Sequence, residues 1–173
     1  PTISFPTDTN GDGSISPTEQ QAGHLGSTIP VTIALPAGVV KGNTVTIDVN
    51  GTPQTHTVTD SDITNGSFTV QATKPPAGSV LDVTATITDN AGHISSQGHN
   101  QAFLEPTTLT VSVPSGVQAG NPVTITGTSN APAGSTVTIT VTDSSGGTPQ
   151  QVTATVQPDG TYSVPVNGLH DGK

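Results

Sequence analysis

The chain has 173 residues, with 12 acidic side chains, 3 Lys, no Arg and no Cys, and its formal net charge is −9. Nucleic acids and anionic membranes bind proteins through basic side chains, so this charge excludes both as partners, and the lack of Cys excludes disulfide scaffolds. With 29% hydrophobic and 2% aromatic residues, the chain can build only thin cores, which bound metals can supplement.

The first predicted element is a short strand at 2–5, and a distinctive loop follows it. Residues 8–19 match every fixed position of D-x-[DN]-x-[DN]-G-x5-E, the calcium loop of EF-hands. Gly13 falls where such a loop turns sharply. The predicted Ca²⁺ ligands are Asp8, Asn10, Asp12, the Ser14 carbonyl, Ser16 (directly or through water) and a bidentate Glu19. The alternative is a solvated Asn/Asp/Gly turn.

The residues after the loop predict a very short helix. Ser16 and Glu19 have the spacing of a capping box, Pro17 suits the first helical position, and Gly23 would end the helix after one or two turns. No amphipathic helix follows that could open as in a calcium sensor. The sequence therefore predicts a structural ion rather than a regulatory one.

The rest of the chain alternates apolar residues with Thr, which predicts an all-β fold. Frequent Gly and Pro punctuate the runs, as in sandwiches and barrels, and Asn50-Gly51, Asn65-Gly66 and Asp159-Gly160 are typical of hairpin turns. A disordered Thr-rich stalk is the alternative, against which the strict alternation argues. The strands predicted before residue 105 are 2–5, 29–35, 44–49, 54–59, 67–72, 80–88 and 93–103; those predicted after it are 107–113, 121–128, 135–142, 150–156 and 161–166.

An internal repeat divides the chain into two units. Residues 31–47 align without gaps on 109–125, and 65–70 resemble 159–164. We place the boundary at Glu105-Pro106, so that the domains are 1–105 and 106–173, joined by a linker short and proline-stiffened enough for a semi-rigid rod. The second unit has two strands fewer than the first. We expect it to be truncated; the alternative is that another chain supplies the missing strands.

Several short motifs resemble tandem immunoglobulin-like repeats of giant, type-I-secreted (RTX-type) bacterial biofilm adhesins. They are the loop at 8–16, Leu35-Pro36-Ala37-Gly38 with Gly42-Asn43-Thr44-Val45-Thr46, and 83–92. The resemblance covers nearly the whole chain. It implies tandem immunoglobulin-like β-sandwiches with Ca²⁺ near domain junctions. It also implies a monomeric, extracellular extender at the bacterial cell surface, whose partners are neighbouring repeats. The chain departs from the family at His93, where Asn is frequent, and in the second unit, which has no calcium loop.

Further acidic residues are weaker candidates for metal ligands. In a sandwich, Glu105 would lie at the same end as the calcium loop, where it and Asp159 could brace the junction between units. Asp60, Asp62 and Asp89 would gather at the opposite end and meet a preceding unit. The alternative for each of these residues is ordinary turn chemistry.

Two other classes of function compete with a spacer. An enzyme is not expected, because no nucleophile elbow or zinc motif occurs and the five His are scattered; His93 and His99 would share one strand face. A calcium-dependent ligand-binding module, lectin-like or ice-binding, is the stronger rival. Sugar platforms need exposed aromatic rings, however, and we expect Phe5, Phe68, Phe103 and Tyr162 to lie in the cores.

Overall fold

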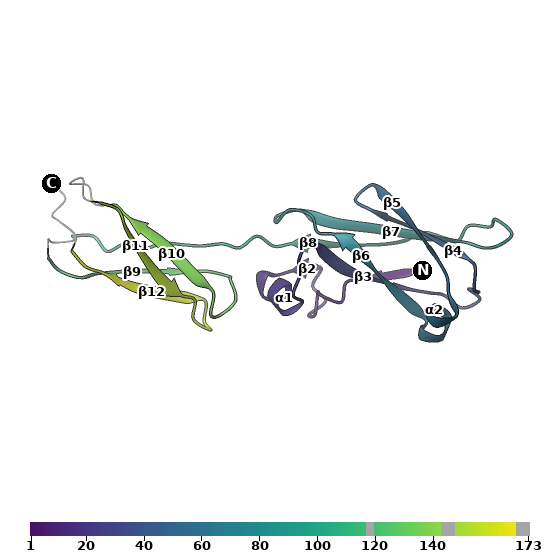
Figure 1. The fold of residues 1–173 in the computed structure, drawn as a ribbon, viewed down its shortest axis with the longest axis horizontal. Helices are drawn as coiled ribbons and strands as arrows, with labels where there is room; N and C mark the ends of the chain where they lie inside the picture. The colour runs from purple at the N-terminus through teal and green to yellow at the C-terminus, as the bar shows by residue number, and fades with distance from the viewer. Residues whose placement is uncertain (117–119, 143–147, 169–173) are drawn as a thin grey trace. The chain divides into compact units, whose positions relative to one another are not determined.

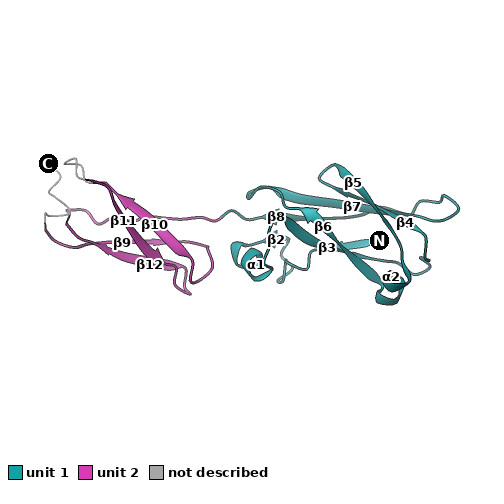
Figure 2. Cartoon of the chain, in the orientation of Figure 1, with its two compact units in different colours: residues 1–106 teal, residues 107–173 magenta. Residues whose placement is uncertain are grey.

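The computed structural model describes residues 1–116, 120–142 and 148–168. The chain is all-β apart from short helices and forms two compact units, unit 1 (Pro1–Pro106) and unit 2 (Thr107–Lys173), which Figure 2 distinguishes by colour. No helix among the described residues is long and apolar enough to cross a membrane.

Unit 1 contains two sheets (Figure 1). The smaller has the order β1-β3-β6 and the larger the order β2-β8-β7-β4-β5. All neighbouring strands are antiparallel except β2 and β8, which are parallel. The strands are β1 (Thr2–Ser4), β2 (Ser14–Ile15), β3 (Thr28–Ala34), β4 (Thr44–Val49), β5 (Thr52–Thr57), β6 (Ser67–Thr73), β7 (Val80–Thr88) and β8 (Gly98–Leu104).

The two sheets of unit 1 pack on a single core. Alternate residues of the central strands point inward, so that β3 buries Ile29, Val31 and Ile33 while β4 buries Val45, Ile47 and Val49. The intervening Thr residues face outward, as the period of two predicts. The other buried apolar residues of this core are Ile3, Phe5, Ile15, Val58, Phe68, Ala72, Leu81, Val83, Ala85, Ile87, Ala102 and Leu104.

Short helices occupy the two ends of unit 1 (Figure 1). The helix α1 (Pro17–Ala22) has the predicted capping box between Ser16 and Glu19 and ends at Gly23, as predicted. The helix α2 (Asp60–Asn65) was not predicted. Its capping box joins Thr59 to Asp62, a T-x-x-D version of the S/T-x-x-E signal that the sequence analysis did not recognise.

The predicted hairpin turns have different outcomes. Asn50 and Gly51 both have positive φ and form the two-residue hairpin between β4 and β5, as predicted. Gly66 instead takes the left-handed conformation to end α2, so the hairpin predicted at Asn65-Gly66 was wrong. Asp159 lies in a turn between strands of unit 2, where its carboxylate accepts hydrogen bonds from Thr161.

The last strand of unit 1 was predicted too long. It begins at Gly98 rather than residue 93, so His93 and His99 do not share a strand face. Phe103 is 39% exposed, because the alternation along β8 turns Ala102 and Leu104 into the core; its predicted burial was wrong. The other three aromatic residues, Phe5, Phe68 and Tyr162, are buried as predicted.

The described residues of unit 2 form two strand pairs. β9 (Val123–Thr128) pairs with β12 (Thr161–Val166), and β10 (Thr136–Val141) pairs with β11 (Gln150–Thr155). Within the described residues, the strand predicted at 107–113 forms only isolated bridges, from Leu109 to Ser129 just after β9 and from Ser112 to Thr126 in β9. The core of this unit consists of Ile125, Val137, Ala154, Val156, Tyr162, Val164 and Val166.

The strand pairings correct the phase of the internal repeat. β3 pairs with β6, and β9 pairs with β12, so β9 is the counterpart of β3. The alignment of 31–47 on 109–125 instead matches β9 with β4, the next strand of unit 1. By the same criterion β10 corresponds to β4, and their sequences, TVTITV and TVTIDV, differ at one position. The alignment slipped because V-T-I alternation after a Gly-containing turn recurs along the chain and does not identify an individual strand.

Two surfaces of unit 2 lack the cover that their counterparts have in unit 1. β4 lies between β5 and β7, whereas within the described residues β10 pairs only with β11. Ile139 is therefore half-buried, although Ile47 at the same position of β4 is fully buried. The second surface is the segment 107–113, where Leu109, Val111 and Val113 are each at least half exposed, whereas Ile3 in β1 of unit 1 is buried. Completion of unit 2 by further strands stays a prediction.

A matched pair of substitutions tests this difference in cover. Ile47→Ala should lower the free energy of unfolding of unit 1 by about 2–5 kcal/mol, because it leaves a cavity in a closed core. Ile139→Ala should cost unit 2 roughly half as much, because the side chain already contacts solvent. Denaturant unfolding followed by NMR signals from each unit measures both. Equal losses would mean that β10 is covered in solution.

Candidate metal-binding loop

The predicted calcium loop lies at one end of unit 1, together with α1, β2 and the end of β8 (Figure 1). Its first side chain, Asp8, organises the backbone. Asp8 Oδ1 accepts hydrogen bonds from Gly11 N (2.8 Å) and Asp12 N (3.2 Å), and Oδ2 accepts one from Gly13 N (3.0 Å). Gly13 has φ +84°, as the sharp turn predicted at this position requires.

Asn10 and Asp12 lie in the same turn. Asn10 Oδ1 accepts a hydrogen bond from Asp12 N (3.1 Å), and Asn10 Nδ2 donates to Asp12 Oδ2 (2.9 Å). Asp12 Oδ1 accepts from Ser14 N (2.8 Å). The side chains at positions 1, 3 and 5 are therefore joined through one hydrogen-bonded turn. Asn10 and Asp12 are exposed, so both can exchange their partners without opening the core.

Glu19 has a different environment, since it is only 8% exposed. Its Oε1 accepts from Thr9 N and Thr9 Oγ1, and its Oε2 accepts from Ser16 N and Ser16 Oγ, at 2.9–3.0 Å. Burial alone would raise the pKa of Glu19, but the hydrogen bonds from Ser16 and Thr9 outweigh it and lower the pKa from 4.5 to about 2. Glu19 is thus ionised, and both of its oxygens are engaged.

The donor chemistry of the loop fits a hard cation, with one adjustment. The candidate ligands all offer oxygen, as Ca²⁺ prefers. No group of three or more His, Asp or Glu side chains in the described ranges is arranged to hold an ion. The Glu19 carboxylate caps α1 and is engaged by Thr9 and Ser16. To ligate an ion, Glu19 has to exchange hydrogen bonds from Thr9 and Ser16 for the metal.

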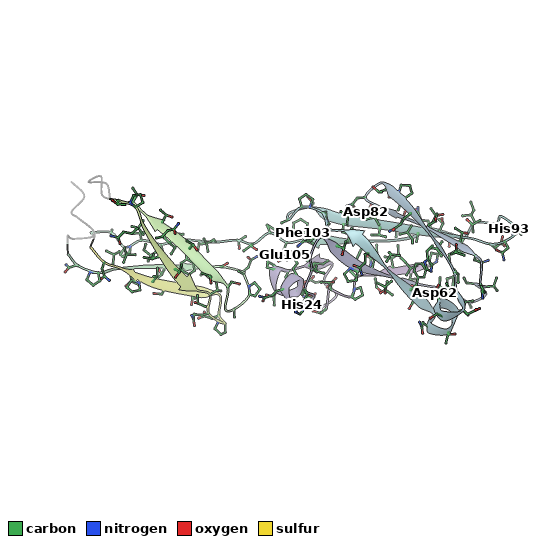
Figure 3. All side chains as sticks on the ribbon, viewed as in Figure 1. His24, Asp62, Asp82, His93, Phe103 and Glu105 are labelled. Carbon is green, nitrogen blue, oxygen red and sulfur yellow. The ribbon has the colours of Figure 1, made fainter. Side chains whose placement is uncertain are left out.

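The candidates predicted at the opposite end of unit 1, where Figure 3 labels Asp62, each serve a local structure. Asp60 pairs with Lys41 on the surface. Asp62 accepts from Thr59 N and Oγ1 and lies 2.8 Å from His56 Nε2. Burial would raise the pKa of Asp62, but the hydrogen bonds from His56 and Thr59 lower it overall.

Asp89 at the same end forms the turn that follows β7. Its Oδ1 accepts from Ala91 N and His93 N, and its Oδ2 lies 2.9 Å from His93 Nδ1. These bonds, that of the His93 side chain first, lower the pKa of Asp89. Turn and capping chemistry thus accounts for Asp60, Asp62 and Asp89, and their role as ligands stays a prediction.

Glu105 is close to the loop through its main chain. Its N–H donates to Ile15 O (3.1 Å), and its carbonyl accepts from Gln20 Nε2 (3.1 Å). Gln20 and Thr9 were not predicted as part of this end of the unit, because Thr9 occupies a variable position of the calcium-loop pattern and Gln20 lies just beyond it. A shared site of Glu105 with Asp159 stays a prediction.

Two of the solved structures that resemble this chain show a limited likeness to it. One is a tetra-tandem repeat in the extending region of a large adhesion protein, with 23% identity, a TM-score of 0.38, and coverage of 98% of this chain and 40% of that one. The other concerns host cell surface retention of a 1.5-MDa bacterial ice-binding adhesin, with 25% identity, a TM-score of 0.35, and coverage of 82% and 47%. This chain therefore spans less than half of each. No family model and no curated protein matches it.

The Glu19 carboxyl should titrate far below its ordinary pKa in calcium-free protein. Since its pKa in the folded state is depressed, its contribution to stability is complete above pH 4.5 and is lost as the pH falls towards about 2. Carboxyl ¹³C NMR over this range measures the midpoint. Thr9→Val, which removes one of the four hydrogen bonds, should raise it. A midpoint near 4.5 in the unmodified chain would show that the cap does not form.

Proposed function

We propose that the chain is a calcium-stabilised extender module of a bacterial cell-surface adhesin. Its two units are immunoglobulin-like repeats of a secreted, RTX-type protein, which hold a distal ligand-binding region away from the cell. The role is structural rather than enzymatic, and its partners are neighbouring repeats of the same polypeptide.

One observation carries this proposal: the twelve-residue loop lies at the end of β8, from which the chain leaves unit 1. Loop carbonyls accept hydrogen bonds from Phe103 N and Glu105 N, and Pro106 ends the unit. An ion in the loop would thus stabilise the segment that leads to the next unit. The two likenesses to adhesin structures add no support, because their TM-scores are too low.

Thin cores explain why a metal would be useful to such a module. Binding to the folded form stabilises it by about 1.4 kcal/mol when calcium is at ten times Kd. Extracellular calcium sites typically have Kd values of about 10⁻⁴–10⁻³ M, so the gain is modest in global stability. The larger local effect would be to neutralise Asp8, Asp12 and Glu19 within one short loop.

A calcium-dependent ligand-binding module is the alternative, and Phe103 favours it. This ring is exposed on the outer face of β8 beside Val80, its cross-strand neighbour, which is also exposed. Aromatic surfaces of this kind can stack on sugars. Binding on a glycan array that is lost in Phe103→Ala would favour the alternative, as would inhibition of ice recrystallisation by the intact chain.

Calorimetry on chelator-stripped protein tests the proposed metal. Calcium should bind with a Kd of about 10⁻⁴–10⁻³ M, and Asp12→Ala should weaken binding by at least about tenfold, because it removes a charged ligand at position 5 of the loop. Small-angle scattering of the same samples should show a stiffer particle with calcium.

Asp82→Ala is the matched control, since Asp82 is an exposed carboxylate of β7 far from the loop in sequence. This variant should bind calcium as the unmodified chain does. Equal weakening in both variants would indicate diffuse attraction to an acidic surface. An absence of binding heat would reduce the loop to a turn and defeat the proposal.

A further inference from the structure

The loop and the end of β8 are joined by main-chain hydrogen bonds. The short strand β2 runs parallel to β8, with Ser14 opposite Phe103 and Ile15 opposite Leu104. Phe103 N donates to Gly13 O (2.9 Å), and Glu105 N donates to Ile15 O (3.1 Å). The accepting carbonyls lie on either side of Ser14, whose own carbonyl is the candidate ligand at position 7. A shift of the loop backbone therefore reaches β8 directly.

Gln20 adds a side-chain link between the same two segments. Its Nε2 donates to Ile15 O and to Glu105 O, both at 3.1 Å, and so joins the loop to a residue 85 positions later in the chain. The acceptors belong to the main chains of β2 and of the residue that follows β8. Gln20 therefore closes one end of the β2–β8 pair.

The position of Gln20 depends on the candidate ligands beside it. Gln20 N donates to Ser16 O (2.9 Å), which fixes the residue in the first turn of α1. Its neighbour Glu19 caps that turn through Ser16 and Thr9. Each connection between the loop and β8 therefore lies next to a candidate ligand. Ser14 lies between Gly13 and Ile15, whose carbonyls accept from β8, and Glu19 directly precedes Gln20. Movement of Glu19 towards an ion would alter α1 where Gln20 begins.

The amide of Leu104 provides an internal reference. Leu104 N donates to Ser79 O (2.9 Å), and Leu104 O accepts from Gly78 N (2.7 Å), so this residue bonds to the side of β7. Its neighbours Phe103 and Glu105 bond to the loop instead. The amides of Phe103 and Glu105 therefore report on the contact of β8 with the loop, and the amide of Leu104 reports on its contact with the β7 side. Figure 3 shows Phe103 and Glu105 at this end of the unit.

We propose that Gln20 couples the Asp8–Glu19 loop to the end of β8, so that an ion held by the loop fixes the segment through which the chain leaves unit 1. Gln20 is a positioning residue: it contacts no ion but transmits the state of the loop to Glu105. This inference rests on the proposed calcium binding and adds to it the route by which the ion acts on the exit segment.

Amide hydrogen exchange of the 173-residue chain, followed by NMR without calcium and at saturation, tests the coupling. Protection of the Phe103 and Glu105 amides should rise by about tenfold on calcium binding, while that of Leu104 should change by less than about threefold. A uniform rise at all three amides, or no rise at Phe103 and Glu105, would overturn the inference.

Substitution of Gln20 separates coupling from binding. Gln20→Ala should keep the calcium Kd within about threefold, because no ligand is lost, yet reduce the calcium-dependent protection of Glu105 to less than about threefold. Gln20→Glu has a side chain of similar size but lacks the amide donor. It should give the same calcium Kd and the same reduced protection of Glu105 as Gln20→Ala, which would show that lost packing is not the cause. Gln21→Ala, an exposed position of the same helix, should leave both quantities unchanged.

The outcomes distinguish the two proposals. An absence of calcium binding by calorimetry in the unmodified chain contradicts the proposed function. If Gln20→Ala and Gln20→Glu bind calcium and still show the full calcium-dependent protection of Glu105, the proposed function stands. The coupling through Gln20 is then overturned. Loss of calcium affinity in both Gln20 variants also overturns it, since Gln20 would then shape the site instead of transmitting its state.

Discussion

Burial of one face of each strand against a facing sheet is the interaction on which this chain depends. Its strands alternate β-branched apolar residues with Thr, so a strand contributes to stability only when an opposite sheet covers its apolar side. β4 and β10 demonstrate this requirement, because nearly the same hexapeptide is fully buried on alternate positions in unit 1 and only partly buried in unit 2. Local sequence sets the strand, and its neighbours determine how much stability it provides.

Scarcity of cations is the second constraint on the structure. With 3 Lys against 12 acidic residues, most carboxylates have to find other partners. Asp8 and Glu19 use backbone and hydroxyl donors, whereas Asp62, Asp82 and Asp89 lie against His56, His99 and His93. Acidic residues therefore act here as helix caps and turn formers. The same residues resemble metal ligands in the sequence because both roles place carboxylates close together in loops.

Prediction from the sequence succeeded where local chemistry decides the conformation. The alternating strands, the capping box of α1 and the Asn50-Gly51 hairpin all depend on neighbouring residues. It failed where tertiary contacts decide. β2 has only two residues and forms because it pairs with β8. Phe103 is exposed because the alternation along β8 directs Ala102 and Leu104 into the core. In the loop, the spacing predicted the capping bonds between Glu19 and Ser16 but not the two hydrogen bonds that Thr9 donates to Glu19.

Within the described part of the chain β10 has a strand partner on one side only, which has a consequence for the behaviour of the chain in solution. Natural sheets protect their outermost strands with lysine, proline or an inward-pointing charge, since unpaired N–H and C=O groups recruit strands from other molecules. β5, the outermost strand beside β4 in unit 1, contains Pro53, whereas β10 has no charged residue or proline between Thr136 and Val141. Its uncharged row of Val, Ile and Thr has the composition of segments that stack into intermolecular sheets. When the edge stays uncovered, it offers a place for self-association.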